Sequence, residues 1–243
     1  MTPAPTRVVL AAVALVLGAA TLGCGFLSSA KQSVDNLSAI SDISNLLGKS
    51  AQLTFTADYA LVDGSGTATV VQQPPNAAFL AKNGRYILTA EALLMCTTAN
   101  GSTTCQRTPN SGGSMGNAEQ AAMLSAIGGG GFISTPMALA LLTAASVVPG
   151  VKVDKSRRTV AGMDSTCLKA AGMPRDSDPK SVEPKEFTVC VADSGLLTTF
   201  IGTGTDDKSF GVELRAYRTT VDPKAFAPPA GAKIVNVDQL QPK

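Results

Sequence analysis

The sequence predicts an α+β fold, a strongly curved antiparallel β-sheet (a half-barrel) with helices covering its concave face. Three observations support this class. Most of the chain after residue 51 consists of short segments in which apolar and polar residues alternate with a period of two. Turn signals separate these segments at regular intervals, and two Ala- and Leu-rich stretches of helical composition interrupt the series. Such a series is typical of an antiparallel sheet that curves or nearly closes.

Residues 1–23 are predicted to form a secretion signal. Arg7 is the only charged side chain before an apolar run at residues 8–20, which has the length of a signal core and is short for a membrane span. Cys24 follows small residues, and this resembles the lipobox of bacterial lipoprotein precursors, where the cysteine is acylated and becomes the new N-terminus. Two acyl chains would give stable anchoring. We therefore expect a lipidated tether at 24–29 and a single domain at 30–243.

The lipobox departs from the family pattern in one respect. That pattern usually has Leu three residues before the cysteine and a small residue two before it, whereas Thr21 and Leu22 stand in the opposite order here. The alternative is an ordinary signal cleaved after Ala20. It would leave Cys24 as an unpaired thiol on an exported protein, so lipidation is the favoured interpretation.

An amphipathic helix is predicted at residues 30–47 and is expected to end at Gly48. Apolar residues recur there every three to four positions, and the stripe consists of Val34, Leu37, Ile40, Ile43, Leu46 and Leu47. The polar face lacks the basic residues that a helix lying in a membrane surface normally carries. A helix packed on the core is therefore favoured.

Strands are predicted in two groups on either side of a helical region. The first group comprises residues 52–62, 67–73, 77–82, 85–88, 93–98 and 101–108. The second comprises residues 166–170, 186–192, 196–201 and 210–217. Asn83-Gly84 and Asn100-Gly101 are strong signals for tight hairpins. Within the helical region we expect helices at 117–127 and 136–148, with a glycine hinge at 128–131; the second helix is short for a membrane span and is expected to pack on the sheet.

The hairpin at Asn100-Gly101 predicts one disulfide from its register. A two-residue turn there places Cys96 opposite Cys105 as a non-hydrogen-bonded pair, whose short Cα separation a disulfide accepts. Cys167 and Cys190 then remain as the second pair, at the base of a charged loop at 172–184. A zinc site is disfavoured, because the spacing includes no Cys-x-x-Cys and an exported protein lies in an oxidising compartment.

Composition excludes several function classes. A net charge of +2 with 16% charged residues provides no basic block for nucleic acid. The chain has no histidine, so neither a Ser-His-Asp nor a Cys-His mechanism can be assembled from it. The carboxylates of Asp58, Asp63 and Asp193 fall in turns or on polar strand faces without a recognisable pairing. We therefore expect a protein that is not an enzyme and has no cofactor or metal.

The layout of residues 30–237 resembles the lipoprotein-carrier superfamily, which includes LolA and the LppX- and LprG-like envelope lipoproteins. The terminal string, residues 221–226 and 229–234, is similar to the Asp-Pro, Phe, Pro and Gly-Ala-Lys string that closes many members. The two cysteine pairs and the 172–184 loop depart from the simple carrier. The resemblance implies a membrane-anchored lipoprotein on the outer face of the bacterial cytoplasmic membrane that binds a lipid or other hydrophobic ligand between sheet and helices.

The candidate pocket residues are the apolar side chains that the strand and helix patterns direct inward. They are Phe55, Tyr59, Leu61, Val71, Met95, Leu139, Leu142, Phe187, Val189, Phe210, Val212 and Leu214. Plain core packing is the alternative for each of them. The alternative function is an envelope interaction or sensor module of the same fold with a filled core. The pattern leaves the ligand, any protein partner and the oligomeric state open.

Overall fold

The computed structural model describes residues 24–82, 84–109, 132–173, 184–204 and 206–237, with side chains from Asn36 onward. The predicted signal at 1–23, the helix at 117–127, the glycine hinge at 128–131 and most of the 172–184 loop lie outside the described residues. The fold below is that of the described parts of the chain.

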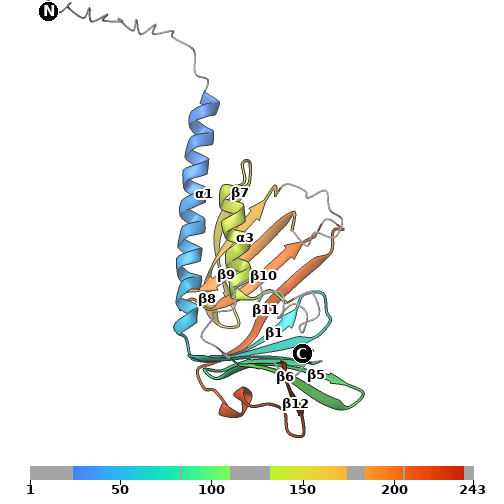
Figure 1. Ribbon diagram of the computed structural model, residues 1–243. Coiled ribbons are helices and arrows are strands. Elements are labelled where there is room, and N and C mark those ends of the chain that lie inside the picture. The colour runs from blue at the N-terminus through green and yellow to red at the C-terminus, as the bar shows by residue number, and fades with distance from the viewer. Residues whose placement is uncertain (1–23, 83, 110–131, 174–183, 205, 238–243) are drawn as a thin grey trace, which may run out of the picture.

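The strands form one open sheet in the order β12-β6-β5-β4-β3-β2-β1-β11-β10-β9-β8-β7. They are β1 (Phe55–Leu61), β2 (Thr67–Gln73), β3 (Asn76–Ala81), β4 (Gly84–Leu88), β5 (Ala92–Ala99), β6 (Ser102–Pro109), β7 (Lys152–Val160), β8 (Met163–Ala171), β9 (Glu186–Ala192), β10 (Leu197–Thr203), β11 (Ser209–Arg218) and β12 (Lys233–Asn236). Neighbouring strands are antiparallel except β12, which pairs in parallel with β6. The sheet bends steeply near β1 and β11, so its two halves form two arms (Figure 1). The predicted curved antiparallel sheet is thereby confirmed.

Two described strands were absent from the prediction, β7 and β12. β7 is exposed along most of its length and carries charges on both faces, so it shows no apolar alternation. β12 has four residues and pairs with a strand more than a hundred positions earlier in the chain. Neither strand carries the local pattern from which strands are recognised in a sequence.

Helix α1 spans Cys24–Lys49, so the backbone of the expected tether at 24–29 is helical. Ile40, Ile43 and Leu47 are buried as predicted, but Leu37 is 57% exposed and is corrected to an outward position. The side chain of Val34 lies outside the described set. None of the described helices is long and apolar enough to cross a membrane.

Helix α3 spans Thr135–Val147 and agrees with the prediction to within one residue at each end. The Ser134 hydroxyl accepts a hydrogen bond from the Met137 backbone N–H and caps the helix, with Pro at its start. Helix α1 packs on β7, β8 and β9, and α3 packs beside α1 (Figure 1). Helix α1 therefore lies over the β7–β9 part of the sheet with α3 beside it, and the expected cover of the whole concave face is not seen in the described residues.

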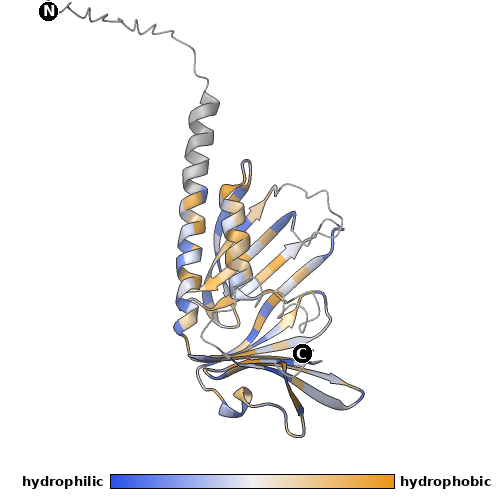
Figure 2. Cartoon of the chain, viewed as in Figure 1, coloured by the Kyte–Doolittle hydropathy of each residue, from blue (hydrophilic) through white to orange (hydrophobic). Residues whose placement is uncertain are grey.

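The apolar side chains form two clusters on opposite faces of the sheet. The larger joins both helices to the inner face and includes Ile43, Leu142 and Phe200. The smaller lies beneath β2–β6 and is closed by residues of the C-terminal segment such as Phe226. Apolar and polar residues alternate along several strands, as two-faced packing requires (Figure 2).

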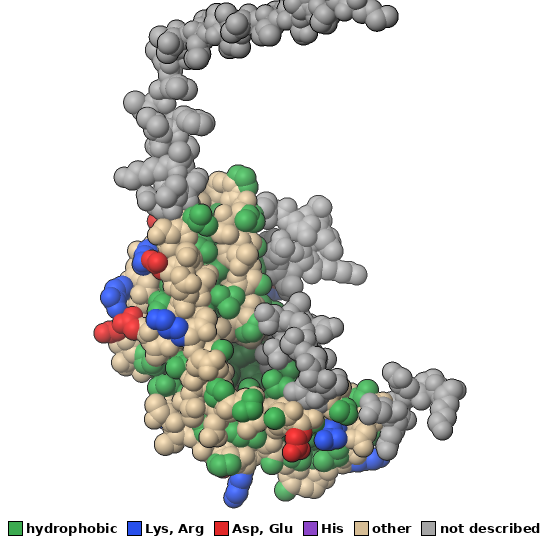
Figure 3. Space-filling view, turned by 60° about the vertical axis from the view of Figure 1, so that its left-hand side comes forward, with side chains coloured by type: hydrophobic (Ala, Val, Ile, Leu, Met, Phe, Trp, Pro, Cys, Tyr) green, Lys and Arg blue, Asp and Glu red, His purple; other side chains and the backbone are tan. Residues whose placement is uncertain are grey.

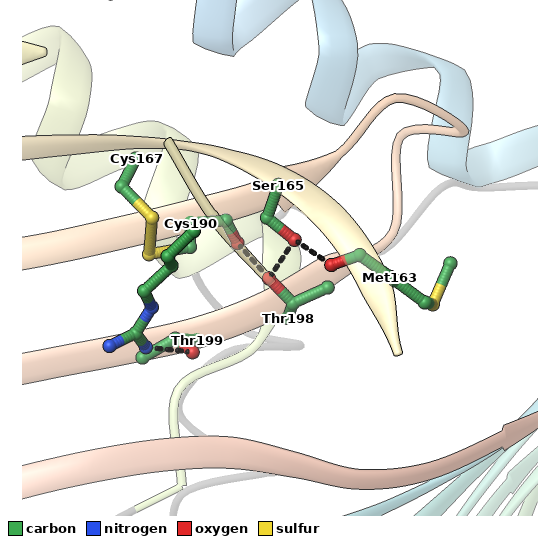
Figure 4. Close-up of a disulfide and its surroundings, with 7 residues drawn as sticks. Met163, Ser165, Cys167, Cys190, Thr198 and Thr199 are labelled. Atoms are coloured by element: carbon green, nitrogen blue, oxygen red, sulfur yellow. Dashed lines mark hydrogen bonds between the residues drawn. A yellow bond between two sulfur atoms is a disulfide. The ribbon is translucent and has the colours of Figure 1, made fainter. Parts of the chain in front are cut away.

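Both predicted disulfides are present, and each joins residues directly opposite on neighbouring antiparallel strands. Cys96 pairs with Cys105 between β5 and β6, with Cα atoms 3.9 Å apart. Cys167 pairs with Cys190 between β8 and β9, with Cα atoms 4.0 Å apart (Figure 4). All four side chains are buried. The turn residue Asn100 has φ 51° and Gly101 has φ 76°, as the predicted two-residue hairpin requires.

A buried polar cluster lies beside the second disulfide. The Thr198 hydroxyl is 3.0 Å from the Ser165 hydroxyl and 3.1 Å from the Cys190 carbonyl oxygen, to which it donates. The Ser165 hydroxyl is in turn within hydrogen-bond distance of the Met163 carbonyl (Figure 4). Each buried hydroxyl therefore has a partner, which removes the free-energy cost of desolvating it.

The turn between β9 and β10 fixes the end of α1 against the sheet. Gly195 has φ 97°, and a Cβ built there would lie 2.5 Å from the Leu46 carbonyl oxygen and 3.0 Å from the Lys49 Cβ. Only glycine combines this backbone conformation with so close an approach. The sheet turn and the last turn of the helix are thus packed backbone to backbone.

We predict that Gly195→Ala lowers the free energy of unfolding by about 2–4 kcal/mol, because it adds a steric clash to an unfavourable φ. The matched control is Gly64→Ala, at φ 75° with nothing within 4 Å of the added Cβ. The control should cost about 1–2 kcal/mol. Urea unfolding of both variants measures the difference, and equal losses would show that the α1 contact is not tight.

Candidate functional site

A cavity of about 530 Å³ lies on the inner face of the sheet, between β1–β4, the end of α1 and the segment that leads into α3. Its strand residues include Phe55, Tyr59, Val70, Phe79, Tyr86 and Leu88. Leu197, the first residue of β10, also lines it, and its loop and helix residues include Leu47, Pro74, Pro75, Phe132, Ile133, Pro136, Leu139 and Leu196. Figure 3 shows hydrophobic side chains gathered at a hollow in the face in view.

The lining of this cavity contains no Asp, Glu, Lys or Arg among the residues that the structure describes. Its polar groups are few, and the main ones are already engaged. The Gln72 amide nitrogen donates to the carbonyl oxygens of Ser50, at 2.6 Å, and Leu53, at 2.9 Å. Ser134 caps α3. The described lining therefore offers burial to apolar groups and no countercharge to an ionised one.

Aromatic side chains form one wall of the cavity. The ring centroids of Phe79 and Phe132 lie 4.3 Å apart, and Tyr59 meets Phe132 edge to face at 6.4 Å. The Tyr59 hydroxyl donates to the Leu197 carbonyl oxygen at 2.7 Å. Burial raises the pKa of the Tyr59 phenol above its ordinary value. The phenol is therefore a neutral, fixed donor, and its ring is held in place at the cavity wall.

Three of the predicted pocket residues line the cavity: Phe55, Tyr59 and Leu139. The inward direction was also correct for the six residues that fill the adjoining core, namely Leu61, Leu142, Phe187, Val189, Val212 and Leu214. Met95 and Phe210 are half-buried at the margin of that core. Val71 is corrected, because it lies in the cluster on the opposite face. Its neighbour Val70 faces the cavity instead.

Much of the lining was missed because it comes from turns and from the ends of elements. Pro74 and Pro75 form the β2–β3 turn, Asn76 is the first residue of β3, and Phe132 precedes α3. Such residues show no periodicity, so alternation cannot assign them to a face. For Phe132 and Ile133, the signal in the sequence was two large apolar residues directly before a helix start, which indicates burial against the sheet.

The carboxylates considered at the sequence level make structural contacts. Asp58 accepts hydrogen bonds from Thr69 and Arg218. Asp63 accepts from the Ser65 backbone N–H, and hydrogen bonding to Ser65, first to its side chain and then to its backbone, lowers the pKa of the Asp63 carboxyl. Asp193 pairs with Arg157. None of the three lines the cavity.

No protein-family model and no curated relative matches the chain. Solved structures that share some of its layout include the crystal structure of MucB in complex with MucA(peri), with a TM-score of 0.39, 13% identity and 80% coverage of this chain. The complex structure of Pseudomonas aeruginosa MucA/MucB gives a TM-score of 0.37, 13% identity and 83% coverage. The matched region spans 61% of each of those chains.

We predict that Tyr59→Phe lowers the free energy of unfolding by about 1–2 kcal/mol, because the Leu197 carbonyl loses its donor inside the protein. Tyr217→Phe, at a half-buried tyrosine on β11, is the control and should cost less than half as much. Urea unfolding of the two variants makes the comparison. If Tyr59→Phe proves neutral, the hydroxyl does not hold the cavity wall.

Proposed function

We propose that the protein is an exported, membrane-anchored lipoprotein that binds a neutral hydrophobic ligand, such as the hydrocarbon chain of a lipid, in the cavity between the sheet and the helices. The observation that carries this proposal is the uncharged apolar cavity of about 530 Å³. That volume lies within the range of small-molecule sites, which are mostly apolar with a few oriented polar groups. Because the described lining of this cavity includes no Asp, Glu, Lys or Arg, the activity that we propose for it is binding.

The driving force for such binding is burial of hydrocarbon. Each methylene moved from water into the cavity contributes about 0.8 kcal/mol. About ten methylenes would contribute roughly 8 kcal/mol before the entropic costs of association are subtracted. The affinity is therefore expected to rise with the length of the buried chain, and the buried part requires no polar recognition.

Charge decides which end of a ligand enters. An isolated carboxylate or phosphate in the cavity would lose its hydration without gaining a cationic partner, which costs several kcal/mol. We therefore propose that the ligand enters by a neutral portion and that any charged group stays outside. The neutral polar groups of Gln72, Asn76 and Ser134 occur in the lining, where they could contact an ester or hydroxyl.

The filled core under β8–β11 favours a second candidate, an envelope interaction or sensor module of the same fold. Phe187 and Phe200 stack there with centroids 5.6 Å apart, and both are fully buried. This half of the inner face has no space for a ligand at those side chains. On this alternative the cavity would remain empty, and a surface of the sheet would carry the function.

We predict that Leu139→Trp weakens binding of the methyl ester of parinaric acid, a neutral fluorescent hydrocarbon chain, by at least about tenfold, because the indole fills the cavity. The control is Val147→Trp on the same helix, at a side chain that is 76% exposed. It should bind as the parent does. Fluorescence titration gives both affinities, and parinaric acid itself should bind more weakly than its ester when ionised. Equal binding by the Leu139→Trp variant would place the ester elsewhere.

We predict that Cys24→Ser releases the protein from the membrane fraction of a bacterial host, because the thiol that receives the lipid is removed. Labelled palmitate should enter the parent and not the variant. Anchoring depends on two acyl chains rather than on a spanning helix in this proposal. A variant that stays in the membrane fraction would contradict lipidation as the anchor.

A further inference from the structure

The outer edge of β7 is a long strand edge at one end of the sheet. Among the strands that the structure describes, β7 pairs only with β8 and is the last strand in the sheet order. At the other end, the four-residue β12 pairs alongside β6 and so leaves only a short edge. A strand edge presents unpaired backbone donors and acceptors, which form a template for another extended chain.

The register identifies which residues present those groups outward. β7 and β8 are joined by a two-residue turn at Ala161-Gly162, both with positive φ, so the closing pair Val160 and Met163 is hydrogen-bonded. Alternation makes Ser156 bond to Cys167. The 4.0 Å separation of the Cys167 and Cys190 Cα atoms supports this register, because so short a separation is typical of a pair without backbone hydrogen bonds. The backbone N–H and C=O groups of Cys167 therefore point away from β9 and toward β7. Lys155 and Arg157 therefore direct their backbone N–H and C=O groups outward.

This edge is exposed and basic. Of the nine residues of β7, all but Val153 and Val160 are exposed. Lys152, Lys155, Arg157 and Arg158 outnumber the single acidic residue, Asp154. Lys155 pairs with Asp42 on α1, and Arg157 pairs with Asp193. Both ion pairs are solvent-exposed, so replacing either acidic partner by a carboxylate of a bound peptide costs little free energy. The side chain of Arg158 bonds to Thr199 on the opposite face, so cationic groups flank the edge on both faces.

We propose that the β7 edge binds an acidic, extended polypeptide segment as an added strand. Backbone hydrogen bonds would supply the affinity, and the flanking lysines and arginines would select a segment rich in Asp or Glu. A second copy of β7 is disfavoured by like-charge repulsion, and a membrane surface offers no ladder of backbone groups. β7 contributes no residue to the lining of the cavity, so this surface is independent of the proposed ligand site.

The test uses the full-length protein in mild detergent and a blocked, fluorescent peptide as long as β7 in which glutamate and valine alternate. Fluorescence anisotropy should show binding that weakens as salt is added. The same peptide with alternate amides N-methylated should bind at least about tenfold more weakly, because strand addition needs those N–H groups. A peptide with lysine in place of glutamate should not bind.

Protein variants locate the site. The double variant Lys155→Glu with Arg157→Glu should lose binding, whereas Lys233→Glu, an exposed site on β12 at the other edge, should keep it. Undiminished binding of the N-methylated peptide, or of the β7 variant, would overturn the proposal. So would binding to anionic phospholipid vesicles in the absence of any binding to the acidic peptide. Each of these results leaves the cavity proposal untouched.

Discussion

One apolar face of a twelve-stranded sheet must be removed from water, and the two described helices achieve this over only part of it. This constraint organises the rest of the molecule. Where α1 lies over β7–β9 with α3 beside it, Ile43, Leu142 and Leu168 are fully buried in a continuous core. Beyond the end of α1, the same face borders a cavity. The filled core and the cavity thus lie on the same face of the sheet, and the end of α1 marks the boundary between them.

The geometry of that boundary depends on a few rigid contacts. Gly195 allows the β9–β10 turn to meet the last turn of α1, and Tyr59 ties β1 to the start of β10 through Leu197. The cross-strand disulfides hold neighbouring strands in each arm of the sheet. On the outer face, the C-terminal segment buries the Cys96–Cys105 bridge. Contacts on both faces therefore hold the sheet in its curved form, while the part of the inner face at the cavity stays open.

The sequence predicted those features that depend on local periodicity. One strand and its inward face were predicted from the alternation of Phe55, Ala57, Tyr59 and Leu61. The hairpin at Asn100 predicted which two cysteines form the first disulfide. Val71 was assigned to the wrong face because β2 is apolar on both: Val70 faces the cavity and Val71 the outer cluster.

Other features depend on distant contacts, and alternation could not supply them. β7 lacks an apolar face because it is an edge, and β12 is recognisable only beside β6. Alternation also identifies which side chains point inward, but not whether the space among them is filled. Phe187 and Phe55 were equivalent in the sequence, yet one lies in packed core and the other lines the cavity. The difference comes from where α1 ends and where Phe132 returns to the sheet.

The central claim is that the cavity holds a neutral hydrophobic molecule. Its most direct test is native mass spectrometry of the full-length protein, purified in mild detergent from a lipid-containing bacterial host, followed by denaturing lipid extraction. The account predicts a discrete added mass beyond that of the anchor, released on denaturation as an uncharged lipid or a lipid with its charge outside the buried chain. A clean mass that stays unchanged after incubation with neutral and acylated lipids would contradict it.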